Sequence, residues 1–148
     1  MKKQFVTILG LVLLFAVSIT AAENLNKKIT NEQIEENLLV GLQSDNLGLR
    51  VSSAYLLGEI KPSEKAILLL MKTLRDDPDP RAKTMAALTL VKLEDERGLF
   101  LVQSQCKFSQ DCKVRKMCQH LYASYLSKKQ GALKETRDTL FASITNLK

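Results

Sequence analysis

Residues 45–60 read DNLGLRVSSAYLLGEI, and residues 76–91 read DDPDPRAKTMAALTLV. Aligned at an offset of 31, both stretches begin with an aspartate and carry an arginine five positions later. The matched pairs are Asp45 with Asp76, Arg50 with Arg81, Leu57 with Leu88, and Ile60 with Val91. A third, weaker copy follows at an offset of 34, in which Val114 and Arg115 lead into Cys118, Leu121, Tyr122 and Tyr125. A period of about 30 residues indicates stacked repeats.

Each copy has the pattern of a helical hairpin. Thr30 and Gln33 form a capping box ahead of an apolar stripe at Ile34, Leu38, Leu39 and Leu42. Prolines punctuate the chain, because Pro62 disfavours helix in the residue before it and Pro80 suits a first helical position. No segment alternates as a strand does. We therefore predict an all-α fold with helices over residues 31–43, 49–60, 64–75, 80–93, 95–106, 111–128 and 133–147.

The second helix of each copy resembles the HEAT-like repeat family in its short bacterial form, which reads Val-Arg-x-x-Ala-Ala-x-Ala-Leu-Gly-x-Leu. The matching residues are Leu49, Arg50, Ser53, Ala54, Leu56, Leu57, Gly58 and Ile60, then Pro80, Arg81, Thr84, Met85, Ala87, Leu88 and Val91. The resemblance covers Asn31 to about Leu126. It implies a right-handed α-solenoid of about three helical hairpins, closed by a C-terminal capping helix, within a domain of residues 31–148.

The third copy departs from this family pattern. Gln110 stands where the turn aspartate belongs, and Cys118 and Gln119 replace the paired small residues. In this family, aspartates and arginines at the turns form a ladder between repeats, which implies a structural role here. An arginine at the start of a second helix would reach an aspartate of the neighbouring repeat, so Arg81→Ala should lower stability. The expected ladder residues are Asp45, Arg50, Asp76, Arg81 and Arg115.

The N-terminal residues have the pattern of a secretory signal. Lys2 and Lys3 precede an apolar run from Phe5 to Val17, and Thr20-Ala21-Ala22 offers small residues for cleavage. We expect a signal peptide at residues 1–22, a linker at 23–30 and export to the periplasm or the extracellular space. The alternative is an uncleaved signal that anchors the protein in the inner membrane.

Composition narrows the possible functions. The 148 residues include no Trp, one His and no glycine-rich phosphate loop, so catalytic, cofactor-binding and metal-ligating residues are not predicted. The stretch from Lys107 to Lys148 carries 9 basic and 3 acidic residues. Such a basic end could contact an anionic surface, whereas export argues against nucleic acid as the partner.

Three cysteines in an exported chain allow one internal disulfide. Cys106 ends one predicted helix and Cys112 begins the next, so we predict a Cys106–Cys112 disulfide with Cys118 buried and free. Cys106–Cys118 is the alternative. A Cys112–Cys118 bond is excluded, because six residues along a helix rise about 9 Å. A zinc site at these cysteines and His120 would have unusual spacing.

The same alignment predicts a partner-binding face on the concave side of the second helices. Its expected members are Ser52, Tyr55, Glu59, Lys83, Ala86, Leu90, Met117 and His120. A mixed surface of this kind suits protein recognition. We therefore expect a non-enzymatic, exported protein-interaction module or adaptor. The alternatives are an accessory protein that holds a ligand, similar to HEAT-like bilin lyases, and a binder of anionic surfaces.

Overall fold

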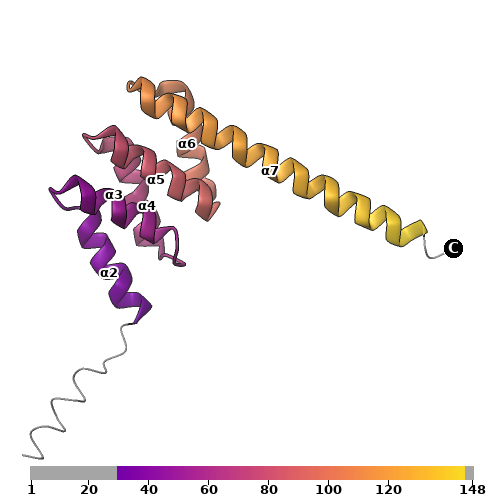
Figure 1. The fold of residues 1–148 in the computed structure, drawn as a ribbon, viewed down its shortest axis with the longest axis horizontal. Coiled ribbons are helices and arrows are strands. Elements are labelled where there is room, and N and C mark those ends of the chain that lie inside the picture. The colour runs from indigo at the N-terminus through magenta and orange to yellow at the C-terminus, as the bar shows by residue number, and fades with distance from the viewer. Residues whose placement is uncertain (1–29, 146–148) are drawn as a thin grey trace, which may run out of the picture. The chain divides into compact units, whose positions relative to one another are not determined.

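The computed structural model describes residues 30–145, and side-chain environments within residues 30–137. In this range the chain is all-helical, as predicted (Figure 1). The predicted signal peptide, and the linker up to residue 29, lie outside the described residues. The chain divides into two compact units after Gln33, and only Thr30–Gln33 of the first unit are described. The helices are α2 (Asn31–Leu42), α3 (Leu47–Leu57), α4 (Glu64–Asp76), α5 (Pro80–Leu93), α6 (Glu96–Phe108) and α7 (Cys112–Thr145).

Short polar side chains begin the helices. The capping box at α2 is present: the Gln33 amide donates to Thr30 Oγ1, and the Thr30 amide donates to Gln33 Oε1. Further N-caps are Asn46, Ser63, Asp79 and Asp95, each accepting a backbone N–H from the first turn of its helix. Asp111 accepts from the amides of Lys113 and Val114 in the same way. These caps explain why the sequence predicts most helix starts to within two positions.

Helix α5 lies at the centre of the packing. It contacts α3 and α7 on one side of the molecule and α4 and α6 on the other. Its Leu90 is fully buried, and the α6 backbone approaches so closely that a Cβ at Gly98 would lie 2.8 Å from Leu90 Cδ2. The largest fully buried side chains are Leu57, Leu70, Leu74, Leu90, Val102, Val114 and Cys118. Burial of this kind is the main source of stability in the fold.

Corresponding positions recur along the chain at a spacing of 33 and then of 32. The N-cap residues Asn46, Asp79 and Asp111 follow this spacing. The buried small residues Ser53, Ala86 and Cys118 repeat it, as do Leu57, Leu90 and Tyr122, which pack in or against the core.

The predicted offset of 34 to the third copy is therefore two positions too long. The predicted offset of 31 between the first two copies is two positions too short. It matched Leu57, which is 0% exposed, with Leu88, which is 39% exposed. Two positions turn a helix by about 200°, so the error exchanges the buried and exposed faces of α5. The aspartates on which the alignment rests are misleading, because Asp45 and Asp76 are not the caps.

The turn contacts follow the corrected spacing. The Arg50 guanidinium binds Asp77 with two bonds, Nε to Oδ2 at 2.8 Å and Nη2 to Oδ1 at 3.2 Å. This pair links α3 to the end of α4, and hydrogen bonding to Asp77 raises the Arg50 pKa. The two corresponding cations contact backbone carbonyls, Lys83 that of Arg75 at 2.9 Å and Arg115 that of Ser109 at 2.8 Å.

Four of the five predicted ladder residues do not connect repeats. One of them is Arg115, whose guanidinium donates to the Ser109 carbonyl in the turn before its own helix. The Arg81 side chain is 74% exposed and pairs with Asp79, its own N-cap. Asp76 pairs with the adjacent Arg75, and Asp45 is exposed and contributes its backbone carbonyl to Arg50. Arg81 lies two positions before the cation site that Lys83 occupies, so the same register error explains its misassignment.

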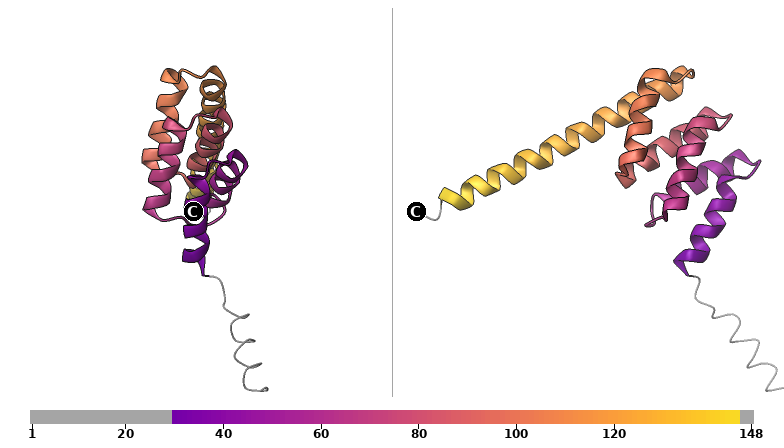
Figure 2. Two further views of the ribbon diagram at one scale, coloured as in Figure 1. Left: turned by 90° about the vertical axis from the view of Figure 1, so that its left-hand side faces the viewer. Right: turned by 180° about the vertical axis from the view of Figure 1, so that it is seen from behind.

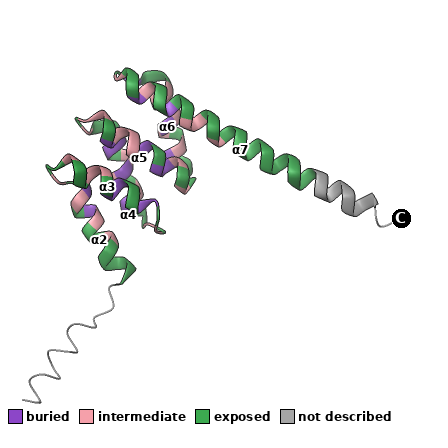
Figure 3. Ribbon diagram, viewed as in Figure 1, coloured by how far each residue is buried: buried purple, intermediate pink, exposed green. Residues whose placement is uncertain are grey.

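Helix α7 is continuous from Cys112 to Thr145 (Figure 2). The predicted break after Lys128 and the separate capping helix from Leu133 are wrong. Gly131 is the signal for that break, but one helical glycine costs only about 1 kcal/mol and the flanking lysines, alanine and leucine favour helix. The described residues of α7 from Leu126 onward are exposed and cover no core (Figure 3).

Candidate functional site

The structure tests the exposure of each predicted partner-binding residue. Ser52, Tyr55, Glu59, Met117 and His120 are exposed, as a binding face requires. Ala86 and Leu90 are 0% exposed and belong to the core, so their assignment to the face is wrong. Lys83 is half-buried, and its Nζ is engaged with the Arg75 carbonyl.

The corrected spacing replaces the three misassigned residues of α5. Met85, Leu88 and Lys92 correspond to Ser52, Tyr55 and Glu59 on α3. Leu88 and Lys92 are exposed, and Met85 is half-buried. We define the α3–α5–α7 face as Ser52, Tyr55, Glu59, Met85, Leu88, Lys92, Met117, His120 and Ser124.

One ion pair shows that α3 and α5 are neighbours on this face. Lys92 Nζ lies 2.7 Å from Glu59 Oε1. Hydrogen bonds from Lys92 and then Tyr55 lower the pKa of Glu59, so its carboxylate is charged at neutral pH. The pair is half-exposed, and a contact of this kind adds little to stability. Lys92 also lines one of the two hollows described next.

A hollow of about 270 Å³ lies between α5 and α7. Leu88, Val91, Leu121 and Tyr125 form its apolar walls, with Lys92, Glu94, Ser124 and Lys128 among them. The Lys129 ammonium lies 5.7 Å from the centre of the Tyr125 ring, where a cation is attracted to the ring face. We call this the α5–α7 hollow. It presents an apolar surface bordered by lysines.

A second hollow of about 480 Å³ lies at the other end of the same helices. Val51, Pro80, Thr84 and Met85 line it, together with the charged residues Asp79, Arg81 and Lys113. It also combines apolar walls with cationic side chains. We call this the N-terminal hollow. An extended partner segment on the α3–α5–α7 face could therefore place one apolar side chain in each hollow.

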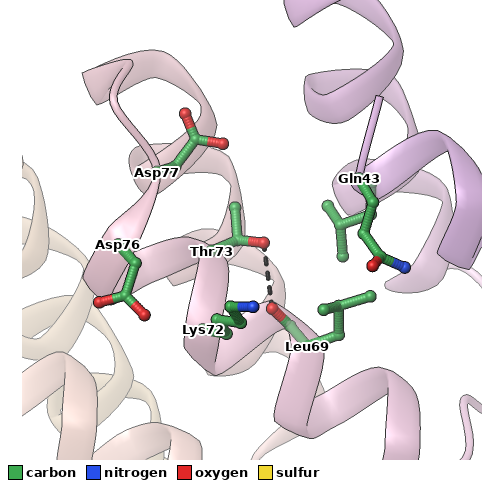
Figure 4. Close-up of a pocket in the computed structure, with 7 residues that line it drawn as sticks. Gln43, Leu69, Lys72, Thr73, Asp76 and Asp77 are labelled. Atoms are coloured by element: carbon green, nitrogen blue, oxygen red, sulfur yellow. Dashed lines mark hydrogen bonds between the residues drawn. The ribbon is translucent and has the colours of Figure 1, made fainter. Parts of the chain in front are cut away.

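Other hollows have less binding chemistry to offer. One of about 300 Å³ between α2 and α4 holds Gln43, Thr73, Asp76 and Asp77 (Figure 4). Four of its polar side chains already have partners within the chain: Gln43 and Thr73 donate to the carbonyls of Leu39 and Leu69, and Arg50 and Arg75 bind the two aspartates. Lys72 also lines it. A further hollow of about 480 Å³, beside Phe100 on α6, lies between α4 and α6 and is bordered by the charges of Glu96 and Arg97.

The cysteines are free thiols in this structure, so the predicted Cys106–Cys112 disulfide is not formed. Cys112 is exposed at the first residue of α7, whereas half-buried Cys106 packs against the core that contains Cys118. Burial raises the pKa of Cys106 and raises that of Cys118 to about 12, so both thiols are protonated at neutral pH. A thiol with so little thiolate is a poor nucleophile.

The described part of the chain offers neither a metal centre nor a membrane span. No group of three or more His, Cys, Asp or Glu side chains there could hold a metal ion. No helix in that part has the length and hydropathy needed to cross a bilayer. No protein family and no curated protein matches this chain. Its function is therefore argued from the α3–α5–α7 face and the two hollows along it.

Proposed function

We propose that this chain is an exported, non-enzymatic member of the HEAT-like repeat proteins that binds another protein through the α3–α5–α7 face. In this proposal α2 to α7 form a short right-handed solenoid of three hairpins. The recurrence of cap, cation and small buried residue at spacings of 33 and 32 supports it. Recurrence of structurally equivalent positions at a nearly constant spacing is what stacked repeats require.

The two hollows along one face carry the proposal. Both have apolar walls with basic side chains at their edges, and both are lined by residues of successive second helices. The α5–α7 hollow, at about 270 Å³, is below the usual 300–1,000 Å³ of small-molecule sites and suits a single inserted side chain. The size of this hollow favours a side chain of a peptide segment over a held chromophore, whereas the N-terminal hollow, at about 480 Å³, lies within the small-molecule range. The lysines at the edges favour acidic residues beside the inserted apolar ones.

Site-specific photo-crosslinking tests the proposal. A photoreactive amino acid is placed at Leu88 on the face, and in a matched control at Leu68 on α4; these leucines are 39% and 50% exposed. In the producing cell, position 88 should give one discrete protein adduct that position 68 does not give. Equal adducts from both positions, or none from position 88, would contradict a binding role for this face.

Leu88→Asp should remove the partner without unfolding the protein, because the side chain already contacts solvent. Its control is Leu68→Asp, which introduces the same charge at a comparably exposed leucine on α4, away from the α3–α5–α7 face. Capture of the crosslinked partner should fall for the first variant and persist for the second. If both variants retain the partner, the contact lies elsewhere.

Export is a separate part of the proposal and rests on residues 1–22. The mature chain should begin near Glu23, and intact-mass measurement of the exported protein decides this. A full-length mass in the membrane fraction would indicate an uncleaved anchor instead.

A further inference from the structure

The C-terminal half of α7 is a helix without a described packing partner for its apolar residues. Every residue from Leu126 to Arg137 is exposed, and the helix continues to Thr145 (Figure 3). A helical segment without packing contacts gains little stability from helix propensity alone, and Gly131 lowers it further. Most helical stability in proteins comes from packing of an apolar face. The segment therefore exposes apolar side chains that a binding partner would cover.

The sequence of this segment has a heptad pattern. Leucine occurs at 126, 133, 140 and 147, each seven positions after the last. Leu126 is 41% exposed and Leu133 is 64% exposed. With the leucines at d positions, the a positions are Ala123, Gln130, Arg137 and Ile144. Leucine is the residue that two-stranded coiled coils favour at d, and of the four a positions only Ala123 and Ile144 are apolar.

The width of the seam separates a helical partner from a membrane surface. A helix that lies on a lipid surface needs a broad apolar face opposite a polar one. Over the described residues the apolar row is one leucine wide, because Gln130 and Arg137 occupy the a positions beside Leu126 and Leu133. Further along the sequence, Phe141 at an e position and Ile144 at an a position widen it. A narrow seam fits one partner helix and gives little area for insertion into lipid.

The charges beside the seam oppose pairing with a second copy. Lys129 is at a g position and Lys134 is at the following e position. In a parallel pair of identical helices, these two lysines would face each other across the interface and repel. Arg137 would also meet its own copy within the seam. Glutamates on the partner would remove both conflicts.

We propose that the segment of α7 from Leu126 onward forms a two-stranded coiled coil with an acidic amphipathic helix of another protein. The leucines would pack against leucines of the partner, and Lys129 and Lys134 would pair with its e and g glutamates. The leucines of this interface lie outside the α3–α5–α7 face, whereas Lys129 also contacts Tyr125 of the α5–α7 hollow.

The test uses two synthetic peptides of four heptads, with Leu at d, Val at a, and either Glu or Lys at both e and g. Binding to the purified protein is measured by fluorescence anisotropy of the labelled peptides. The Glu peptide should bind at least about tenfold more tightly than the Lys peptide. The Leu126→Ser/Leu133→Ser double variant should weaken Glu-peptide binding by at least about tenfold. The Ala132→Ser control, at a c position off the seam, should leave it unchanged.

Both leucines are exposed, so the double variant should keep the wild-type melting temperature of the folded part, which circular dichroism verifies. Absence of Glu-peptide binding, or equal binding of the two peptides, would overturn the proposal. So would a peptide-free dimer in sedimentation that the double variant abolishes, since the occupant would then be a second copy. Binding to vesicles of phosphatidylglycerol and phosphatidylcholine that requires both leucines, without Glu-peptide binding, would assign the segment to membranes.

Discussion

Replacement of Leu90 or Leu88 by alanine distinguishes the two possible registers of α5. Leu90 is fully buried, and alanine removes three carbon atoms, each worth about 0.8 kcal/mol of transfer free energy. A residual cavity of roughly 50 Å³ adds about 1 kcal/mol at about 24 cal/mol per Å³. Leu90→Ala should therefore lower the free energy of unfolding by about 3–4 kcal/mol. Leu88→Ala should lower it by about 1 kcal/mol, because its side chain is 39% exposed and leaves no enclosed cavity.

The assay is urea unfolding followed by circular dichroism at 222 nm, fitted with a common slope for the wild type and both variants. The midpoint for Leu90→Ala should fall well below that for Leu88→Ala. The offset of 31 makes the opposite prediction, because it aligns Leu88 with the buried Leu57. If Leu88→Ala is the more destabilised variant, the spacing of 33 and the α3–α5–α7 face derived from it are refuted.

Four further outcomes follow from the structure. Arg50→Gln should lower the melting temperature, because Asp77 loses a nearly buried partner, whereas Arg81→Gln should leave it almost unchanged because that guanidinium is solvated. A maleimide should label exposed Cys112 first and Cys118 only after unfolding. Burial of the neutral Cys118 thiol stabilises the fold, and this contribution is complete below pH 9, the pKa of the thiol in the unfolded chain. The contribution is lost as the pH rises through about 12, the pKa in the folded protein, and Cys118→Ala should not show this loss of stability at alkaline pH. Gly131→Ala should increase helicity, by about 0.5–1 kcal/mol of local stability, because its Cβ would enter open space.

Most of the helical structure could be predicted from local chemistry. Thr30 and Gln33 cap α2 as their spacing requires, and Asp79 with Pro80 starts α5 at the predicted residue. These signals act within one helical turn, so they need no knowledge of the tertiary contacts. The break predicted between residues 128 and 133 did not form, because one glycine in that stretch cannot outweigh the good helix formers around it.

The register of the repeat could not be predicted from matching residue types. Aspartates occur at 76, 77 and 79, and any one of them could be aligned with Asp45. Their roles differ only in three dimensions, where Asp79 caps α5, Asp77 binds Arg50 and Asp76 pairs with Arg75. The small residues give a better signal, because Ser53-Ala54 and Ala86-Ala87 are 33 positions apart.

The register error affects the candidate site only in α5. Met117 and His120 are exposed as predicted, because the errors in the two offsets cancel between the first and third copies, whereas Ala86 and Leu90 are buried. The two hollows were beyond prediction, because each depends on how residues from different helices meet. The cysteine pairing failed for the same reason: proximity along the chain favoured Cys112, but the packing of α6 on α7 places Cys106 with the core near Cys118.

The central position of α5 sets how the molecule opens. Four other helices contact α5, and the Thr89 hydroxyl on α5 donates to the buried Ala54 carbonyl of α3 at 2.8 Å. Exposing α5 amides to water requires α5 to separate from all four of these helices. The first turn of α2 can open with the loss of few packing contacts. Amide hydrogen exchange should therefore be slowest around Ala86–Leu90 and should quicken toward both ends of the chain. A partner on the α3–α5–α7 face would rest on the slowest-exchanging helix, so binding there would proceed without a prior folding step.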